Sequence, residues 1–281
     1  MLPMIATRSA IIEPREISLM TLRLTNPGER GIDASGGDLV LTDVVVSGAG
    51  SSDVDAGGGL WFESGALTLE DVVFDTNEAE RGGAVGLGAG CSVQGSNLAF
   101  TTNVAGDSGG ALDVGAGATV EMTTVTMTGN TAPGGGAIEI GASADLSVDG
   151  GTWTDNRASD EDREGGAIHL GADATLTIAV GEFTGNGSDA NNSGMNGDDI
   201  TADEDGAIVV IADSAFSDPH TYGGAAQLYL EGAVTASVEG TTFTDGYAGI
   251  WGASDDTEIA LDGCVIEGTE NRALISYGTF S

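Results

Sequence analysis

The sequence contains no lysine, and its eight basic residues, all arginine, stand against 44 Asp and Glu, for a formal net charge of -36. Proteins that bind nucleic acid need a cationic surface to displace the counterions of the phosphates, and anionic membranes select the same surface. Nucleic acid and anionic membrane surfaces are therefore excluded as partners. The 40% hydrophobic content is nevertheless enough to build a substantial core.

Cysteine and long apolar segments are also scarce. Cys91 and Cys264 are the only cysteines, and neither has thiols or histidines nearby at the spacing of a metal site. No apolar run approaches the roughly 20 residues of a membrane helix, and residues 1–10 lack the apolar core of a signal peptide. We expect no direct membrane insertion of this segment. Because strand-like sequence already begins at Ile12, we expect a piece of a longer protein.

Glycine, in contrast, is abundant, with 47 residues, and it recurs as a pair followed by a small or aliphatic residue. From Gly59 to Gly166, successive second glycines are 24, 27, 26 and 30 residues apart. A large apolar residue follows each pair, 17 residues after the second glycine in four consecutive repeats, and Asn comes three residues later. The apolar and Asn positions are Phe74 and Asn77, Phe100 and Asn103, Met127 and Asn130, Trp153 and Asn156, and Phe183 and Asn186.

Between these positions the sequence alternates with period two, as in Ala137-Ile138-Glu139-Ile140, and no helical periodicity is long enough to cross between parallel strands. Each repeat is expected to hold three short strands of three to five residues. One repeat cannot bury its own apolar side, whereas stacked repeats can. The sequence therefore predicts an all-β, single-domain, right-handed parallel β-helix of roughly ten coils about 4.8 Å apart. Residues 1–16 are expected to cap it, and residues 17–281 to form the β-helix with an acidic insertion at 187–205.

The repeat spacing also predicts which side chains stack. The large apolar residues should form an internal column, and the Asn side chains should stack at a corner, where amides can bond to copies above and below. The glycine pair should occupy another corner, where a Cβ would clash or φ must be positive. Cys91 and Cys264 lie about seven coils apart, roughly 30 Å, so no disulfide can join them.

The pairing of Gly-Gly-Ala-Ile-like with Phe-x-x-Asn-like segments, clearest from Gly58 to Asn186, resembles the repeats of chlamydial polymorphic outer membrane proteins. It is similar more widely to bacterial right-handed parallel β-helix repeat proteins. The resemblance covers the chain from about Gly31 onward and implies a secreted or surface-displayed adhesin or autotransporter passenger. The same architecture also carries tailspikes, polysaccharide lyases and epimerases, so it does not by itself decide function.

The acidic insertion at 187–205 is a candidate calcium site. It contributes Asp198, Asp199, Asp203, Glu204 and Asp205, and carboxylate oxygens are the ligands that Ca²⁺ takes in proteins. The alternative is a solvated acidic loop. No other cofactor is required by the sequence.

A second candidate site lies in the next coil, where Asp218-Pro219-His220 resembles part of the catalytic motif of alginate C5-epimerases and related lyases. That resemblance implies His220 as base, Asp218 as its electrostatic partner and Tyr222 as acid. In that family a Tyr-Gly pair precedes the triplet, whereas here Tyr222-Gly223 follows it.

Two further features of the strands carry alternatives. His169 is aligned with Glu139 and Asp113 of neighbouring coils, either as a titrating member of a carboxylate ladder or, as we expect, as an exposed residue that softens like-charge repulsion. Paired outward Thr residues, as at Thr126 and Thr128, could bind ice or mineral. The array is interrupted, however, by Asp75, Ala99, Glu182 and Ala215, and β-propensity on a solvent face explains it better.

Together these observations favour a non-catalytic β-helix that is secreted or displayed at the cell surface, as an adhesin, passenger or structural stalk with an acidic surface. Its partner would be an extracellular glycan or protein receptor, and the oligomeric state stays open. A polysaccharide lyase or C5-epimerase acting near Asp218 and His220 is the alternative, and an ice- or mineral-binding face the second. An acidic surface without lysine is suited to a saline or calcium-rich exterior.

Overall fold

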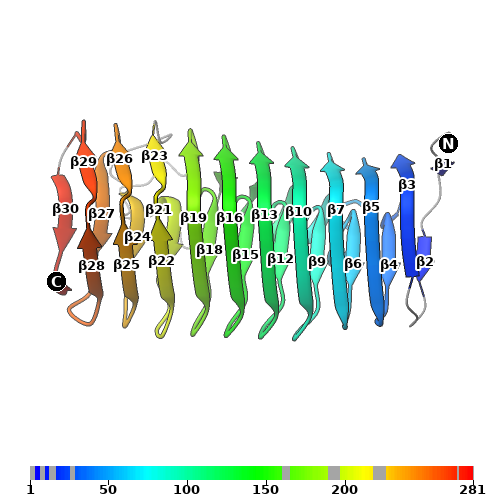
Figure 1. The fold of residues 1–281 in the computed structure, drawn as a ribbon, viewed down its shortest axis with the longest axis horizontal. Coiled ribbons are helices and arrows are strands. Elements are labelled where there is room, and N and C mark those ends of the chain that lie inside the picture. The colour runs from blue at the N-terminus through cyan, green and yellow to red at the C-terminus, as the bar shows by residue number, and fades with distance from the viewer. Residues whose placement is uncertain are drawn as a thin grey trace.

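The structure is a computed structural model that describes residues 4–6, 10–12, 17–25, 29–159, 165–188, 197–217, 226–270 and 272–280. These residues form β-strands and turns, stacked in layers along one long axis (Figure 1). All strand pairs are parallel, and each strand pairs with its equivalent one turn further along the chain. The predicted all-β parallel β-helix is confirmed. The described residues contain no helix long and apolar enough to cross a membrane.

Three parallel sheets run along the stack, here called sheets A, B and C. Sheet A has 15 strands: β1 (Met4–Ala6), β3 (Ile17–Thr25), β5 (Asp38–Ser47), β7 (Ala66–Asp75), β10 (Ser92–Thr101), β13 (Thr119–Thr128), β16 (Asp145–Thr154), β19 (Thr175–Thr184), β22 (Ile208–Ala212), β23 (Ala215–Ser217), β25 (Thr235–Glu239), β26 (Thr242–Thr244), β28 (Glu258–Asp262), β29 (Val265–Glu267) and β31 (Thr279–Phe280).

Sheet B has 11 strands: β2 (Ala10–Ile12), β4 (Ile32–Ala34), β6 (Leu60–Phe62), β9 (Val85–Leu87), β12 (Leu112–Val114), β15 (Ile138–Ile140), β18 (Ile168–Leu170), β21 (Gly197–Ala202), β24 (Ala226–Leu230), β27 (Ala248–Gly252) and β30 (Arg272–Ser276). Sheet C has five: β8 (Glu78–Arg81), β11 (Val104–Ser108), β14 (Thr131–Ala132), β17 (Arg157–Ala158) and β20 (Gly187–Ser188). From β4 to β27 the chain completes about eight turns, slightly fewer than the ten predicted, and β2 and β30 add one strand at either end.

The strands of sheet A are longer than the three to five residues expected. From β5 to β19 they have ten residues each, because the chain bends within the strand instead of ending it. The bend falls on one left-handed residue, for example Asp43, Asp71 or Thr124, with φ of 55°, 55° and 56°. There the burial alternation breaks, and Thr123 and Thr124 are both exposed. Sequence alternation alone does not reveal this bend, since such φ values are uncommon outside glycine.

The predicted column of large apolar side chains is confirmed inside the stack. Phe74 and Phe100 stack with ring centroids 5.4 Å apart. Trp153, Phe183, Phe216 and Phe243 form a second stack, with successive centroids 4.4, 4.4 and 4.7 Å apart. Met127 occupies the layer between the two stacks, and all seven residues are fully buried. All seven belong to one continuous core.

The predicted Asn column is also confirmed, and it is fully buried. Its members are Asn77, Asn103, Asn130, Asn156 and Asn186. In each layer the Asn Nδ2 and backbone N–H donate to Oδ1 of the next Asn at 2.9–3.0 Å, as from Asn103 to Asn130. The same Nδ2 donates to a backbone carbonyl of the preceding layer, so every amide is bonded in both directions. Five buried amides are thereby satisfied without water.

The glycine pairs occupy the corner that precedes sheet B, as predicted. The first glycine has positive φ in four of the described pairs, for example 59° at Gly109 and 54° at Gly135, whereas in the first repeat the positive φ, 62°, is at Gly57, one residue before the Gly58-Gly59 pair. The second has no room for a side chain, since a Cβ on Gly110 would lie 2.2 Å from the carbonyl oxygen of Gly136. The two cysteines are free thiols, with Cys91 buried and Cys264 half-buried.

Candidate functional site

The outer face of sheet B carries an aligned row of polar side chains. Asp113, Glu139, His169 and Thr201 are register partners on β12, β15, β18 and β21. Their strand neighbours, such as Leu112 and Val114, fill the core, so alternation turns the polar residues outward. Asp113 and His169 are nevertheless only 8% and 7% exposed. These charged side chains of the row are therefore largely buried on the outer face of sheet B and are not fully exposed to solvent.

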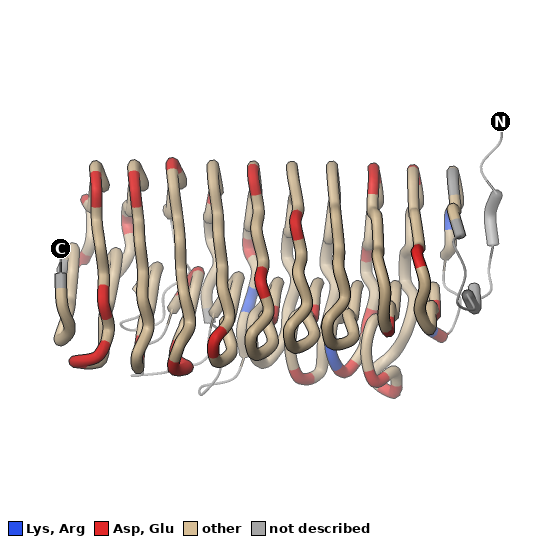
Figure 2. The backbone as a smooth tube through the Cα atoms, turned by 60° about the horizontal axis from the view of Figure 1, so that its bottom comes forward, with Lys and Arg blue, Asp and Glu red and all other residues tan. Residues whose placement is uncertain are grey.

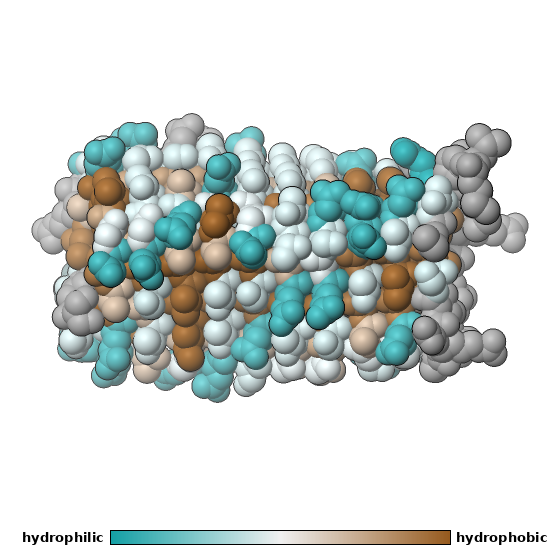
Figure 3. Space-filling model, in the orientation of Figure 1, coloured by the Kyte–Doolittle hydropathy of each residue, from teal (hydrophilic) through white to brown (hydrophobic). Residues whose placement is uncertain are grey.

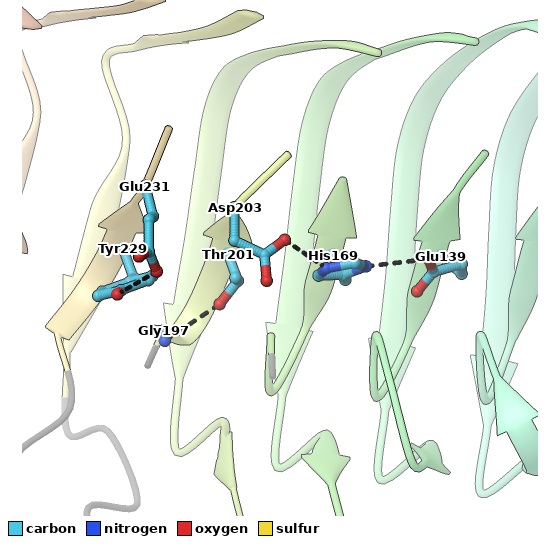
Figure 4. Close-up of polar contacts among 7 residues, drawn as sticks. All are labelled: Glu139, His169, Gly197, Thr201, Asp203, Tyr229 and Glu231. Carbon is cyan, nitrogen blue, oxygen red and sulfur yellow. Dashed lines mark hydrogen bonds and ion pairs between the residues drawn. The ribbon is translucent and has the colours of Figure 1, made fainter. Parts of the chain in front are cut away.

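His169 lies between two carboxylates (Figure 4). Its Nδ1 is 2.9 Å from Glu139 Oε1, and its Nε2 is 2.9 Å from Asp203 Oδ1. When both ring nitrogens face carboxylates, both must carry protons to donate, so the doubly protonated imidazolium is the favoured form. The alignment of His169 with Glu139 was predicted, but the partnership with Asp203 was not.

The groups around His169 determine its protonation state. Burial lowers its pKa, but the hydrogen bonds and charges of Asp203 and Glu139 outweigh burial and raise the pKa to about 10. The expectation of an exposed histidine is wrong, because Asp203, in the turn after β21, and Glu139 enclose the ring from both sides. A histidine that stays protonated at neutral pH is a poor general base, so the arrangement neutralises charge.

Asp113 continues the row towards the N-terminal end. Its carboxylate lies 3.7 Å from Nη1 of Arg81, which projects from β8 of sheet C. Burial raises the pKa of Asp113 to about 6, with Arg81 opposing and Glu139 and Asp107 adding to the rise. Glu139 Oε2 is buried and has no hydrogen-bond partner among the described residues. Two crowded carboxylates therefore face each other beside the imidazolium.

Aromatic residues extend the same row in both directions. On the C-terminal side, Tyr229 and Trp251 are the next register partners, and Tyr229 Oη donates to Glu231 Oε2 at 2.7 Å. On the N-terminal side, Trp61 of β6 lies under the Arg30 guanidinium, 5.9 Å from the ring centroid. The outer face of sheet B thus presents aromatic groups at both ends and charged groups in the middle.

The structure does not gather the five residues predicted to bind calcium. Asp198 and Asp199 lie within β21, 1% and 0% exposed, whereas Asp203, Glu204 and Asp205 follow the other end of that strand. The four positions from Asp199 to Asp203 correspond to roughly 13 Å of extended chain. Asp203 is already engaged by His169. Among the described residues no group of three or more His, Cys, Asp or Glu is placed to hold a metal ion.

Part of the segment expected to be an insertion belongs to the coil itself. Residues 197–202 form β21, which pairs with β18 and β24 in sheet B. Asp199 Oδ1 accepts a hydrogen bond from Asn186 Nδ2 at 2.9 Å, so this carboxyl ends the Asn column. Complete burial raises the pKa of Asp199 to about 8, with the Asn186 hydrogen bond opposing the rise. Sequence reasoning missed this role because no large apolar residue lies three positions before Asp199, as it does before each Asn of the column.

The lyase-like residues Asp218, His220 and Tyr222 lie outside the described residues. Comparisons of the chain with protein-family models, curated proteins and solved structures gave no match. The resemblance to outer membrane protein repeats therefore rests on the sequence motifs, and the β-solenoid fold rests on the structure.

The remaining acidic residues are spread along the outside of the rod (Figure 2). Several are left-handed Asp residues that stand over a glycine of the next layer: Asp155 over Gly185, Asp213 over Gly240 and Asp245 over Gly268. In each case a Cβ on the glycine would lie 2.6 Å from the Asp Oδ1. Because a glycine takes the position of the Asp in the next layer, like charges do not stack directly on one another at these positions.

The broad face of sheet A carries an apolar band along the axis, bordered by hydrophilic side chains (Figure 3). A shallow hollow of about 400 Å³ lies at the bend of this sheet, with Leu69, Gly95 and Met122 beneath Gln94 and Glu121. Beyond the bend, hydroxyl residues are in register over five successive layers: Thr101, Thr128, Thr154, Thr184 and Ser217.

Proposed function

We propose that the chain is a non-catalytic β-helix, secreted or displayed at the cell surface, that serves as an adhesin, passenger or stalk with an acidic exterior. The observation that carries the proposal is the state of His169. The one described histidine is held as an imidazolium between Glu139 and Asp203, where it supports stacking and is not poised to take a proton. The contacts of His169 with Glu139 and Asp203 therefore stabilise the rod.

The composition of the exterior supports an extracellular role. A net charge of -36 makes rods repel one another at low salt and leaves them soluble where salt screens the charge, and the missing lysines make nucleic acid an unfavourable partner. The partner would be an extracellular glycan or protein receptor.

One experiment separates this proposal from a lyase or epimerase. Purified chain is incubated with alginate, pectate and related polyuronates, with and without Ca²⁺, and unsaturated ends and C5 epimers are quantified. We expect no turnover, and retention of the chain on a subset of immobilised glycans or receptors. Turnover that His220→Ala abolishes and His169→Gln leaves intact would overturn the proposal. Antibody access to the protein on intact source cells tests display independently.

Calcium enters this proposal as a ligand of the acidic exterior and not as a required cofactor. Isothermal titration calorimetry of Ca²⁺ at constant ionic strength distinguishes the two modes. We expect weak heats without a defined stoichiometry. Saturable binding lost in the double variant Asp203→Asn, Asp205→Asn would restore a discrete site in the segment after β21.

A second candidate function, binding of ice or mineral, is favoured by the hydroxyl column of sheet A. Five hydroxyls repeat at the layer spacing, and Thr184 Oγ1 lies 3.1 Å from Ser217 Oγ. The companion column is broken by Ala99 and Glu182. Thermal hysteresis and ice-crystal shaping test this function, and Thr154→Lys is the informative variant, since a bulky charge on the column should abolish any effect. Absence of hysteresis in the unmodified chain would remove the candidate.

A further inference from the structure

The corner that holds the Asn column is filled differently in the layers beyond Asn186. In a regular layer the Asn faces a small residue that comes directly before the sheet B strand of its own coil. A Cβ on Gly59, for example, would lie 3.3 Å from Asn77 Cγ. In the two layers after Asn186, Asp199 and Gln227 take the place of this small residue, directly before Ile200 and Leu228. The equivalent residues of the intervening layers are fully buried alanines: Ala84, Ala111, Ala137 and Ala167.

Gln227 fills a corner in which the Asn is missing. Gly246 stands three residues after Phe243, at the position where the regular layers have Asn. A Cβ on Gly246 would lie 3.1 Å from Gln227 Cδ. Gln227 is fully buried, and its amide therefore occupies the space that an Asn side chain occupies in the regular layers.

The orientation of the Gln227 amide is set by the backbone. Gln227 Nε2 donates to the carbonyl oxygen of Thr244 at 2.9 Å. If the amide were turned over, Oε1 would face that carbonyl oxygen, and two acceptors would meet. Oε1 is therefore directed elsewhere and can only accept. It is buried and has no hydrogen-bond partner among the described residues.

Asp199 presents a second buried acceptor in the layer before Gln227. Its Oδ1 accepts from Asn186 Nδ2, whereas its Oδ2 has no hydrogen-bond partner among the described residues. Asp199 and Gln227 are neighbours across the pairing of β21 with β24, because the residues that follow them are register partners. A proton on Asp199 Oδ2 is the one hydrogen that would satisfy both oxygens. Complete burial raises the pKa of Asp199 to about 8 and so retains that proton at neutral pH.

The titratable side chains of the strands next to β21 point away from Asp199. β18, β20 and β24 pack against β21. Their described titratable groups are His169 on β18 and Tyr229 on β24, and both lie on the outer face of sheet B. Within β21 itself, Asp198 is a further buried carboxyl. The hydrogen bond from Asn186 is what opposes the effect of burial on Asp199.

We propose that Asp199 is a carboxylic acid in the folded chain at neutral pH and donates its proton to Gln227 Oε1, so that the hydrogen bonds of the Asn column continue into β24 and the junction between β21 and β24 responds to pH. Loss of the proton would place a buried carboxylate against an oxygen that can only accept. Because burial raises the pKa of Asp199, its contribution to stability is lost as the pH rises towards about 8, and the two layers separate more readily above that pH.

Infrared spectroscopy of the carboxylic acid C=O stretch tests the bond. The difference spectrum between the unmodified chain and Asp199→Asn at pH 7 should contain an acid band, and Gln227→Leu, which lacks the acceptor, should move this band to the frequency of a free acid. Gln227→Leu should also lower the midpoint of the Asp199 titration by about one pH unit, a tenfold change in proton affinity. Thr241→Val, which removes a buried hydroxyl from the same coil, is the matched control and should change neither.

Three spectroscopic outcomes would overturn the proposal. Absence of the acid band at pH 7 would mean that Asp199 is ionised. An acid band that Gln227→Leu does not move would mean that burial alone holds the proton. A midpoint that Gln227→Leu raises would mean that the amide donates to the carboxylate. Circular dichroism verifies folding, and Gln227→Met replaces Gln227→Leu where leucine unfolds the chain.

Hydrogen exchange, expressed relative to the intrinsic rate at each pH, measures the opening of the junction. The Glu231 N–H donates across it to Ala202 O at 2.9 Å, and the Gly141 N–H donates to Val114 O at 2.8 Å in the middle of the rod. Above pH 8 the protection of Glu231 should fall in the unmodified chain and persist in Asp199→Asn, whose amide donates without titrating. Gly141 should stay protected in both. Equal losses at Glu231 and Gly141, or the same loss in Asp199→Asn, would overturn the pH response.

Discussion

The substitution Asp113→Asn should stabilise the protein, and the size of the effect follows from the crowding of Asp113. Burial, opposed by Arg81 and reinforced by Glu139 and Asp107, raises the pKa of Asp113 from 3.8 to about 6. One pKa unit corresponds to about 1.4 kcal/mol, so ionised Asp113 costs the folded state about 3 kcal/mol above pH 6. Because folding raises its pKa, the Asp113 carboxyl favours the folded state most when it is protonated. Its contribution to the free energy of unfolding is therefore greatest below pH 3.8 and is lost as the pH rises through 6.

Asparagine removes this penalty and keeps the shape of the side chain. Its amide can also donate towards the buried Glu139 Oε2, which has no partner among the described residues. Little is lost with the Arg81 contact, because that side chain is 47% exposed and exposed ion pairs contribute less than about 1 kcal/mol. We therefore expect a gain of about 2–3 kcal/mol in the free energy of unfolding at pH 7.5 and almost none at pH 3.5.

The assay is urea unfolding at a series of pH values from 3.5 to 8, with Asp43→Asn as the control that removes the same charge from an exposed position. The control should stay within about 0.5 kcal/mol of the unmodified protein at each pH. An Asp113→Asn protein whose stability has the same pH dependence as the unmodified one would refute the reasoning, and so would an equal gain in the control.

Three further predictions test the stack. His169→Gln should cost about 3–5 kcal/mol at pH 6, because it leaves Glu139 and Asp203 without their cation. The unmodified protein should lose stability as the pH rises from 6.5 through about 10, and this variant should not; equal slopes in urea titrations would contradict the assignment. Asp199→Asn should continue the amide column and abolish the loss of stability between pH 3.8 and 8 that a buried carboxyl imposes, as measured by thermal unfolding; a variant less stable than the unmodified chain at pH 8.5 would contradict this. Gly110→Ala should cost at least about 3 kcal/mol because its Cβ meets the Gly136 carbonyl, whereas Gly117→Ala, in open space with φ of 65°, should cost only about 1–2 kcal/mol; similar losses in both would refute the steric argument.

The internal columns could be predicted because their spacing is a property of the chain. The chain returns to the same place after each turn, so residues at equivalent repeat positions stack. This holds for Phe100, Met127 and Trp153, and also for Asn103, Asn130 and Asn156. The bend of sheet A could not be predicted, since it depends on Asp, Asn, Thr and Val residues held in a conformation they rarely adopt.

The outer row on sheet B was predicted only in its alignment. Asp113, Glu139 and His169 follow from the repeat, but Asp203 reaches His169 from a turn in a segment where the repeat is irregular. The burial of Asp198 and Asp199 is similarly invisible in composition, since their acidic neighbours suggested a solvated loop. Irregular repeats conceal which acidic residues complete a strand and which are exposed.

The internal ring column has a consequence for how the rod comes apart. In a stack where each layer touches only its neighbours, separation starts at the weakest junction. Trp153, Phe183, Phe216 and Phe243 make one block of four stacked rings, Phe74 and Phe100 make a block of two, and the flexible thioether of Met127 joins them. We therefore expect the layer of Met127 to be the junction at which the rod first separates on heating, into two lengths that lose their order at different temperatures.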